Sequence, residues 1–429
     1  MTSDFASLAQ TLADQLVAWR RYFHRHPELA FQEERTAGIV AGHLAQLGLE
    51  VQTGVGRTGV VGILEGAQPG PTALLRFDMD ALPIHEETGL PFASQTPGKM
   101  HACGHDGHSA IGLGVATLLA GQQEHLAGRV KFLFQPAEEI GQGARAMIEA
   151  GALLDPAPDV MFGLHLWSLM PLGQAVVKAG SLWAAADRFA LEIIGHGSHG
   201  AMPHQGIDAI AVAAFAIAQL QTIISRDRDP LQPAVLTIGA IHGGDAFNVL
   251  AERVQMEGTL RTFDLATRAT ILARMDGLLA GLCAAYGAAY RLTWRDFTPP
   301  VINDPRATAH LRAAAAAVLG AEAVADGPMM MVAEDVSEFL NRTPGSFFVL
   351  GAMPDRRARS ETGPSGEAGG GARSETGPSG EAGGGATAPA EPHHSPRFDI
   401  DERALPLGAA ILAHATYTWL LHSPTQQPT

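Results

Sequence analysis

Residues 234–262, AVLTIGAIHGGDAFNVLAERVQMEGTLRT, hold the arrangement that decides the fold of this chain. Two runs rich in apolar and β-branched residues, Ala234–Ile241 and Val254–Thr262, follow one another with no helical pattern between them. Each run therefore predicts a strand. Helical patterns flank this pair of strands on both sides, at Asp208–Ile224 and Leu265–Tyr286.

One further strand is expected outside each of these helices, at Arg188–Ile194 and Tyr290–Trp294. The order of the elements is then β-α-β-β-α-β, which is the ferredoxin-like arrangement. We therefore expect an inserted domain at residues 182–297. The two flanking segments, 1–181 and 298–429, would form one discontinuous domain around it.

The flanking segments alternate short apolar runs with helical patterns. Asp4–Arg25 predicts an amphipathic helix, and Ser109–Ala120 and Gly143–Glu149 predict two more helices. Because strands and helices alternate, we expect an α/β fold whose sheet is covered on both faces. The expected strands of that sheet are Val60–Leu64, Ala73–Phe77, Val130–Phe134 and Val160–Leu166.

Length and charge narrow the class of protein. A chain of 429 residues exceeds what one hydrophobic core usually supports, so two domains are expected. The 44 acidic and 29 basic residues give a net charge of −15, which argues against nucleic acid or an anionic membrane as a partner.

The sequence also bears on the location of the protein. The first residues lack the basic start and apolar core of a signal peptide, and the most apolar stretch, Ala209–Leu220, is too short to span a bilayer. Cys103 and Cys283 alone cannot form a disulfide framework, so we expect a cytoplasmic protein.

A direct repeat interrupts the second flanking segment. Residues 358–371, ARSETGPSGEAGGG, recur unchanged at 372–385 and contain no apolar side chain larger than alanine. Such a composition cannot build a core, so we expect a disordered surface insertion at residues 355–392. A partner-binding role for the repeat is the alternative.

The densest chemical signal is the run His101-Ala-Cys103-Gly-His105-Asp106-Gly-His108, in which five of eight side chains can bind a metal or a proton. Cys103 and His105, two positions apart, could share one side of an extended segment. The alternative is a glycine-rich turn that opens the next helix, with Asp106 as its cap. The number of imidazoles favours a metal site.

Further polar side chains follow three of the expected strands, where open α/β sheets place their sites. Asp78 and Asp80 end the first strand, and their carboxylates could bind a metal directly or orient a ligating imidazole. Glu138 and Glu139 follow the second, so that one could hold a metal while the other activates water. His165 lies in the third. The alternatives are solvated strand ends, an acidic first helical turn and a core histidine.

A glycine pattern in the middle of the chain is a false lead. Gly195–Gly200 reads GHGSHG and follows a strand, as a dinucleotide-binding loop would. The next helix, however, starts only near Asp208, and position 220 is leucine where an acidic residue is needed. Position 196 is histidine, so Ser198 does not lie in a nucleophile elbow.

Together these motifs resemble the metal-dependent amidohydrolases of the aminoacylase/carboxypeptidase type. The similar branch includes hippurate hydrolases, N-acetyl-diaminopimelate deacetylase-like enzymes and plant auxin–amino acid conjugate hydrolases. The resemblance covers nearly the whole chain outside the repeat. It is carried in family order by RRYFHRHPELAFQE, DMDALPIHEETGLPFAS, MHACGHDGHSA, FLFQPAEEIGQGA, GLHLW, GHGSHGAMPHQGIDAI, FNVLAERVQMEGTLR, AEDVSEF and HHSPRFDIDERAL.

The resemblance implies a role for individual residues. Glu138 matches the general base, and Asp80 matches an acid that supports the metal centre. In the inserted domain, which resembles a lid and dimerisation domain, His199 matches a histidine that reaches the partner subunit's site. Asn248 and Arg261 match the pair that recognises the carboxylate side of the substrate. The ligands of two divalent metal ions match Cys103, His105, Glu139, His165 and His394.

The implied reaction is hydrolysis of N-acyl amino acids, such as hippurate-like or N-acetyl compounds, by a homodimer. A bound metal lowers the pKa of water towards about 7, and Glu138 takes its proton. The Cys103 thiolate suits zinc without excluding manganese, cobalt or nickel. The segment before His393 and His394 is long for the family, which makes His394 the least secure ligand and His393 its rival. A dipeptidase or carboxypeptidase with the same site, a binding protein that has lost catalysis and a nicotinamide oxidoreductase are the alternatives.

Overall fold

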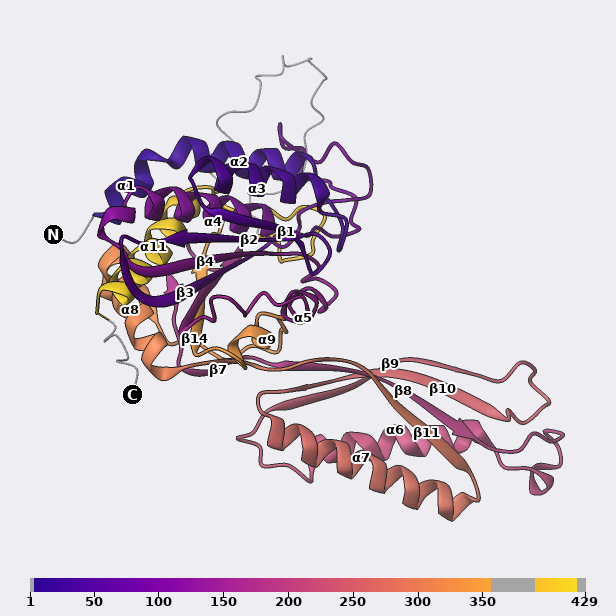
Figure 1. The fold of residues 1–429 in the computed structure, drawn as a ribbon. Helices are drawn as coiled ribbons and strands as arrows, with labels where there is room; N and C mark the ends of the chain where they lie inside the picture. The colour runs from indigo at the N-terminus through magenta and orange to yellow at the C-terminus, as the bar shows by residue number, and fades with distance from the viewer. Residues whose placement is uncertain (1–3, 356–389, 423–429) are drawn as a thin grey trace, which may run out of the picture.

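An eight-stranded mixed sheet forms the centre of the larger part of the molecule, which we call the body (Figure 1). The computed structural model describes residues 4–355 and 390–422. The duplicated segment 358–385 and most of the expected insertion 355–392 lie outside the described residues. In their order across the sheet the strands are β1 (Glu50–Val55), β2 (Gly59–Glu65), β4 (Ala127–Gln135), β3 (Gln68–Asp78), β5 (Val160–Trp167), β14 (Gly345–Gly351), β6 (Ala175–Val176) and β13 (Val324–Ala325).

The middle of this sheet is parallel. Strand β3 pairs in parallel with both β4 and β5, and β14 pairs in parallel with β5. The outer strands β1 and β2 are antiparallel. The carboxyl ends of β3, β4 and β5 therefore lie at one edge of the sheet, where side chains from three separate segments can meet.

Both faces of the sheet are covered, as the sequence predicts. Successive side chains of a strand point to opposite faces, so Leu75 and Phe77 join one apolar cluster while Leu74 joins another. The short helices α5 (Gly143–Glu149) and α9 (Ser337–Leu340) cover the second face. The first face carries a layer of helices most of which are longer (Figure 1): α1 (Phe5–Thr11), α2 (Ala13–Arg25), α3 (Glu34–Gln46), α4 (His105–Ala120), α8 (Pro305–Leu319) and α11 (Ala404–His422).

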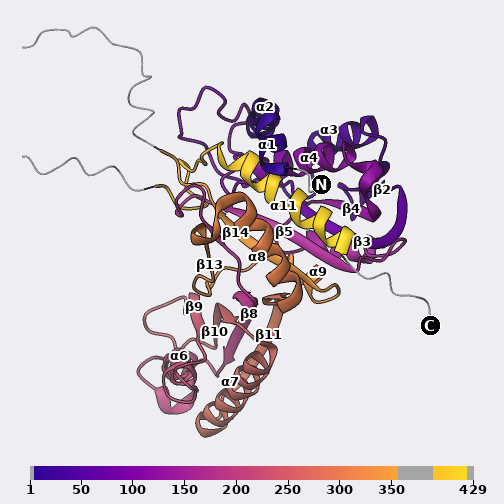
Figure 2. The same ribbon diagram turned by 90° about the vertical axis from the view of Figure 1, so that its left-hand side faces the viewer.

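A second, smaller part projects from the body, and Figures 1 and 2 both show it set apart from the main sheet. We call it the lobe. Its elements follow the predicted β-α-β-β-α-β order, and its antiparallel sheet has the strand order β11-β8-β10-β9. A short pair formed by β7 (Gly180–Trp183) and β12 (Val301–Asn303) lies between lobe and body along the chain. The lobe consists of β8 (Ala185–Ile194), α6 (Ala209–Ser225), β9 (Ala234–Gly243), β10 (Arg253–Thr262), α7 (Leu265–Tyr286) and β11 (Ala289–Thr298).

Alternation along β10 gives the two faces of the lobe sheet different functions. Val254, Met256 and Leu260 are buried against α6 and α7 in the core of the lobe. Residues that alternate with them, including Thr259 and Arg261, point to the opposite face and line a cavity shared with the body. The boundaries of an inserted domain at 182 and 297 remain our proposal.

The structure corrects two predicted helices. The expected single helix Asp4–Arg25 is divided at Leu12, whose backbone N–H bonds to Ala9 O in a tight turn before α2 starts. The helix expected at Ser109–Ala120 begins four residues earlier, at His105. Its first turn follows Gly104, whose φ of 97° is open to glycine and lets the chain turn sharply into the helix.

Helices α7 and α11 are longer than Ala209–Leu220, the most apolar stretch of the sequence. By length and composition alone, α7 and α11 could cross a bilayer. In α11, 72% of the apolar window is buried inside the molecule, against α1, α4 and α8 among other elements. Its apolar character is that of a core helix. The corresponding window of α7 is 28% buried, on the side that faces the lobe sheet.

A buried lysine supplies a test of the body's stability. The Lys131 ammonium is 1% exposed and donates to the carbonyl oxygens of Ala152, Leu154 and Pro156 at 3.0, 2.6 and 2.9 Å. Lys131→Met would leave these carbonyls without their donor, which should lower the free energy of unfolding by about 2–4 kcal/mol in urea titration.

Arg129→Met is the matched control on the same strand. Arg129 pairs with Glu65 at 2.6 Å, but both side chains are largely exposed, so its loss should cost less than about 1 kcal/mol. Equal losses in the two variants would show that the buried lysine contributes no more than a surface pair.

Candidate metal centre

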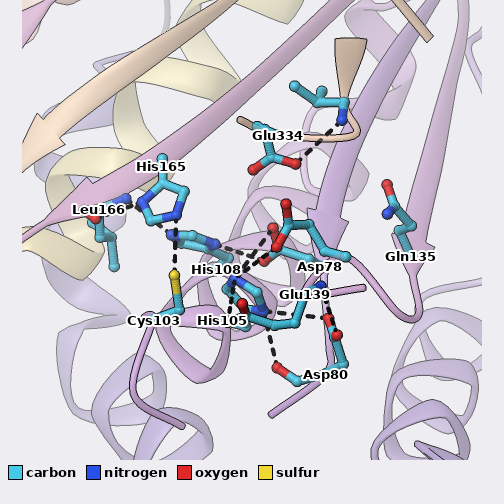
Figure 3. Close-up of polar contacts among 12 residues, drawn as sticks. Asp78, Asp80, Cys103, His105, His108, Gln135, Glu139, His165, Leu166 and Glu334 are labelled. Carbon is cyan, nitrogen blue, oxygen red and sulfur yellow. Dashed lines mark hydrogen bonds and ion pairs between the residues drawn. The ribbon is translucent and has the colours of Figure 1, made fainter. Parts of the chain in front are cut away.

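The predicted polar residues at the strand ends meet at one edge of the main sheet. Asp78 is the last residue of β3 and lies opposite Gln135, the last residue of β4. His165 comes from the end of the neighbouring strand β5. Figure 3 shows Asp78 and His165 converging from separate strands on the first turn of α4, with Gln135 to one side. The parallel arrangement of β3, β4 and β5 is what brings them together.

The run 101–108 divides into residues that face this centre and residues that support it. Cys103 and His105 face it, although not along an extended segment as predicted, because His105 already belongs to α4. The N-cap of this helix is Gly104, so Asp106 is not the cap. Instead the Asp106 carboxylate accepts bonds from Arg20 and His24 at 2.9 and 2.8 Å.

His108 connects Asp78 to the backbone of Leu166 by hydrogen bonds. The Leu166 backbone N–H donates to its Nε2 at 2.9 Å, so this nitrogen carries no proton. The protonated Nδ1 then donates to Asp78 Oδ1 at 2.6 Å. Both ring nitrogens are thereby used. His101 is also buried, and neither of its ring nitrogens has a hydrogen-bond partner within residues 4–355 and 390–422.

Besides Asp80 Oδ1, two possible ligand atoms at the centre are buried and have no hydrogen-bond partner in the described part of the chain. His105 donates from Nδ1 to the backbone oxygen of Asp80 at 2.9 Å, and its Nε2 has no hydrogen-bond partner among the described residues. Burial lowers the pKa of this imidazole, but the charges of Asp78 and Cys103 outweigh burial and raise the pKa well above its usual range. Glu139 Oε1, the other unpartnered atom, lies 3.9 Å from His105 Nε2. Buried polar atoms are normally paired, so an unpartnered imidazole nitrogen and an unpartnered carboxylate oxygen this close together fit a metal ion, which would displace their protons.

Sulfur and a second imidazole lie beside this pair. Cys103 Sγ is 3.5 Å from His165 Nε2, and His165 Nδ1 bonds to Leu166 O at 2.7 Å. Burial lowers the pKa of His165, which keeps the imidazole neutral and able to ligate. Ligand atoms of Cys103, His105 and Glu139 lie within 4.8 Å of one another, as do those of Cys103, His165 and His393.

Both histidines of the C-terminal pair reach the centre. His393 Nδ1 is 3.7 Å from Cys103 Sγ, and its Nε2 accepts from the Ser168 N–H at 3.3 Å. His394, with a left-handed φ of 65°, turns the other way and places Nε2 3.4 Å from Glu139 Oε2. His393 is thus engaged on both nitrogens, while His394 faces Glu139 with one nitrogen. The two remain rival ligands: His393 lies in one group with Cys103 and His165, and His394 lies beside Glu139.

Asp80 and Glu138 lie on either side of Glu139. The Glu139 N–H donates to Asp80 Oδ2 at 3.0 Å, and Asp80 Oδ1 lies 3.4 Å from His105 Nδ1. Asp80 therefore orients two candidate ligands from behind. Glu138 Oε2 approaches the free His105 Nε2 to 3.9 Å.

The carboxylates raise one another's pKa. Burial raises the pKa of Glu138 well above its usual range, and the charges of Glu334 and Glu139 raise it further. Burial and the charge of Asp80 also outweigh His105 and raise the pKa of Glu139 to about 8. Burial, with the charge of Glu139, raises the pKa of the Cys103 thiol. Protons must leave these groups when a cation binds.

Two acidic residues next to Glu138 had no role in the sequence analysis. Arg76 Nη2 donates to Glu334 Oε1 and Asp335 Oδ1 at 2.9 and 3.1 Å, and Arg76 Nη1 donates to Asp78 at 2.6 Å. Ligand atoms of Glu138, Glu334 and Asp335 lie within 4.8 Å of one another. The only signal in the sequence was the motif AEDVSEF, which carries no spacing typical of a site.

The residues expected to bind substrate separate into two groups. Arg261 lines the same cavity of about 920 Å³ as Cys103 and Glu138. It makes no ion pair within the described part of the chain, where it bonds only to Thr259 and to the backbone of Leu260. Burial lowers the pKa of its guanidinium, which would favour an anionic partner.

His199 and Asn248 lie side by side at the far end of the lobe. The N–H of Gly200 donates to Asn248 O at 2.7 Å, and His199 forms a β-bridge with Val249. Strand β10 separates them from Arg261 at its base, by roughly 27 Å at the usual rise per residue. Neither lines the cavity of its own chain.

The chain is similar to characterised proteins over nearly its whole length. Residues 74–365 match the model of peptidase family M20/M25/M40. An N-acyl-L-amino acid amidohydrolase of Geobacillus stearothermophilus is 45% identical over 70% of this chain and 82% of its own. Thermostable carboxypeptidase 1 of Saccharolobus solfataricus is 35% identical over 94% of both chains. The structure of a dinuclear metal-binding peptidase of the M20 family from Bacillus subtilis superposes with a TM-score of 0.79 and 32% identity, over 96% of this chain and 99% of that one.

These matches agree with the unpartnered donor atoms at the strand ends and with the α/β fold around them. The chain belongs to peptidase family M20/M25/M40 and is an amidohydrolase that acts on carbon–nitrogen amide bonds.

Proposed function

We propose that this enzyme hydrolyses the amide bond of N-acyl amino acids. The observation that carries the proposal is one cavity with two features. At its floor lie Cys103, Glu138, Glu139 and His165, and behind the two glutamates lies the buried, unpartnered Nε2 of His105, 3.9 Å from each of their carboxylates. At its wall lies Arg261, which has no ion-pair partner among the described residues. The first suits a metal ion, and the second suits the free carboxylate of an amino acid.

The metal ligands in this proposal are Cys103, His105, Glu139, His165 and His394, and they would hold two divalent ions. The thiolate suits zinc, while manganese, cobalt and nickel remain compatible with a set of sulfur, nitrogen and oxygen donors. When bound, such an ion supplies Lewis acidity, polarising the amide carbonyl and making water acidic near neutral pH.

Glu138 is the general base of the proposed reaction. Its carboxylate lies beside the ligand atom of His105 and reaches the cavity, so it can take a proton from the attacking water. The raised pKa suits the next step, in which the same proton passes from Glu138 to the leaving amine. Asp80 does not reach the cavity and acts by holding His105 and Glu139.

The walls of the cavity support an uncharged acyl group. Trp167, Trp183 and Ile140 line it, and the two indole rings lie 5.8 Å apart beside His165. Apolar and aromatic side chains in the wall favour contact with an acyl chain. A carboxypeptidase that uses the same site is the second candidate, favoured by the similarity to the Saccharolobus solfataricus relative.

We propose a homodimer formed through the lobe. Strand β9 is an edge strand of the lobe sheet, and exposed apolar side chains, Ile241, Phe247 and Val249, lie on it and just beyond it. His199 and Asn248 lie beyond the end of β10, away from their own cavity. A two-fold dimer would bring both into the partner's cavity, where His199 donates to the oxygen of the scissile carbonyl. The free cysteines support a cytoplasmic location.

A substrate panel tests the reaction class. Release of amine would be measured from N-benzoyl, N-acetyl and indole-acetyl amino acids and from dipeptides, with chelator and after addition of zinc, manganese, cobalt or nickel. We expect cleavage of acyl amino acids that chelator abolishes and a metal restores. Cleavage of dipeptides alone would favour the peptidase, and activity unaffected by chelator would contradict the proposed chemistry.

Glu138→Gln tests the general base. The amide keeps the shape of the side chain but cannot take a proton, so the turnover number should fall by about 10²–10⁴. The metal content, measured by atomic emission, should stay that of the wild type because Glu138 is not among the proposed ligands. A variant that is as fast as the wild type would remove Glu138 from this role.

Mixed dimers test whether His199 acts in the partner's site. His199→Ala and Glu138→Gln subunits should each be nearly inactive alone. Random pairing makes half of the dimers mixed, and each mixed dimer regains one complete site, so about a quarter of the wild-type rate should return. If mixing restores no activity, His199 acts in its own subunit or not at all.

A further inference from the structure

The turn that carries Glu138 and Glu139 starts from a constrained backbone. Ala137, the residue before Glu138, is fully buried and has a φ of 53°. A residue with a Cβ atom is disfavoured in this left-handed region, so the surrounding structure must hold it there. Its carbonyl accepts from the N–H groups of Gln142 and Gly143 at 3.3 and 3.1 Å, which closes the turn from one side.

The N–H of Ala137 is held from the other side by a residue distant in sequence. It donates to Glu33 Oε1 at 3.0 Å. Glu33 is the last residue of the segment RRYFHRHPELAFQE, and the proposed chemistry uses none of that segment. The same oxygen accepts from the N–H of Phe31 at 2.9 Å, and the hydroxyl of Thr58 donates to Oε2. Phe31 is itself left-handed, with a φ of 61°.

The Glu33 carboxylate is fully buried and makes no ion pair among the described residues. Burial raises its pKa, and the charge of Asp80 adds to that effect. A buried carboxyl group without a cation is costly unless its hydrogen bonds repay it. The hydrogen bonds of the Glu33 carboxylate hold the left-handed residues Phe31 and Ala137, and with Ala137 the start of the turn that carries Glu138.

The geometry of the turn separates the two acidic residues that it carries. Glu139 has its own anchor, because its N–H donates to Asp80 Oδ2 at 3.0 Å. Glu138 lies between that anchor and the one at Ala137. Loss of the Ala137 anchor would therefore free the peptide before Glu138, while Glu139 stays tied to Asp80.

We propose that Glu33 is a positioning residue for Glu138: through the N–H of Ala137 it fixes the turn that directs the general base at the scissile carbonyl. This inference rests on the function proposed above. Misplacing a catalytic group by about 1 Å can cost 10²-fold in rate, so the anchor matters for turnover more than for substrate binding. Glu33 contributes geometry, not charge.

Two substitutions of Glu33 distinguish geometry from charge. Glu33→Ala removes the acceptor, so kcat should fall by about 10–100-fold with KM and metal content close to those of the wild type. Glu33→Gln keeps an amide oxygen for both N–H groups and loses only the charge, and the Thr58 hydroxyl can turn to accept from the amide. It should restore kcat to within about three-fold of the wild type.

Glu28→Ala is the matched control. Glu28 lies in the same segment and accepts from the backbone of Arg35 and from the backbone and hydroxyl of Thr36, at the start of α3. Its side chain makes no hydrogen bond or ion pair with the turn at 137–143. This variant should lose stability and keep kcat.

Hydrogen exchange supplies a readout that does not depend on catalysis. The amide of Ala137 should exchange faster in Glu33→Ala than in the wild type, in Glu33→Gln or in Glu28→Ala. If no substrate is cleaved by the wild type, the proposed function fails, and exchange at Ala137 still decides the role of Glu33. Unchanged exchange in Glu33→Ala, or a Glu33→Gln variant as slow as Glu33→Ala, would overturn the inference.

Discussion

The arrangement of the centre depends on an excess of buried negative charge. Six carboxylates gather at the edge of the main sheet, and the Arg76 guanidinium pairs with three of them, Asp78, Glu334 and Asp335. The other three, Asp80, Glu138 and Glu139, lie beside His105. Removing such charges from water costs several kcal/mol for each ion unless a cation compensates. Because burial and the neighbouring carboxylates disfavour the ionised forms, the pKa values of Glu138 and Glu139 are raised when no metal is bound. Divalent cations would remove this cost, so the same constraint explains both metal affinity and a base whose proton affinity suits amide hydrolysis.

Two layers of residues build this cluster, one that faces the centre and one that holds the first in position. Parallel strands deliver Asp78 and His165 to one edge, and the first turn of α4 adds His105. Behind them, His108, Asp80 and Glu33 each bind backbone or imidazole atoms and leave the front atoms free. The lobe adds Arg261 from the opposite wall. A rigid floor and a separate wall are what a site needs when the substrate must be oriented as well as polarised.

Much of this architecture could be predicted from periodicity and order. The two consecutive strands at 234–262, with a helix on each side, were enough to predict the order of elements in the lobe, and α7 has the predicted bounds. The start of α4 could not be predicted, because it depends on the left-handed Gly104, and glycine alone does not reveal its φ. Glu334, Asp335 and Glu33 were missed because their importance arises from contacts across more than a hundred residues of sequence. The different directions of His393 and His394 depend on the left-handed backbone of His394, which no local pattern indicates.

The most direct test of the central claim is anomalous X-ray diffraction from crystals grown with zinc, recorded on both sides of the zinc absorption edge. The account predicts two anomalous peaks at the edge of the main sheet, at about 2.0–2.3 Å from ligand atoms of Cys103, His105, Glu139, His165 and His394. Glu138 should lie beside the peaks without ligating either one. Anomalous density confined to Glu138, Glu334 and Asp335, or absent from this edge of the sheet, would contradict it.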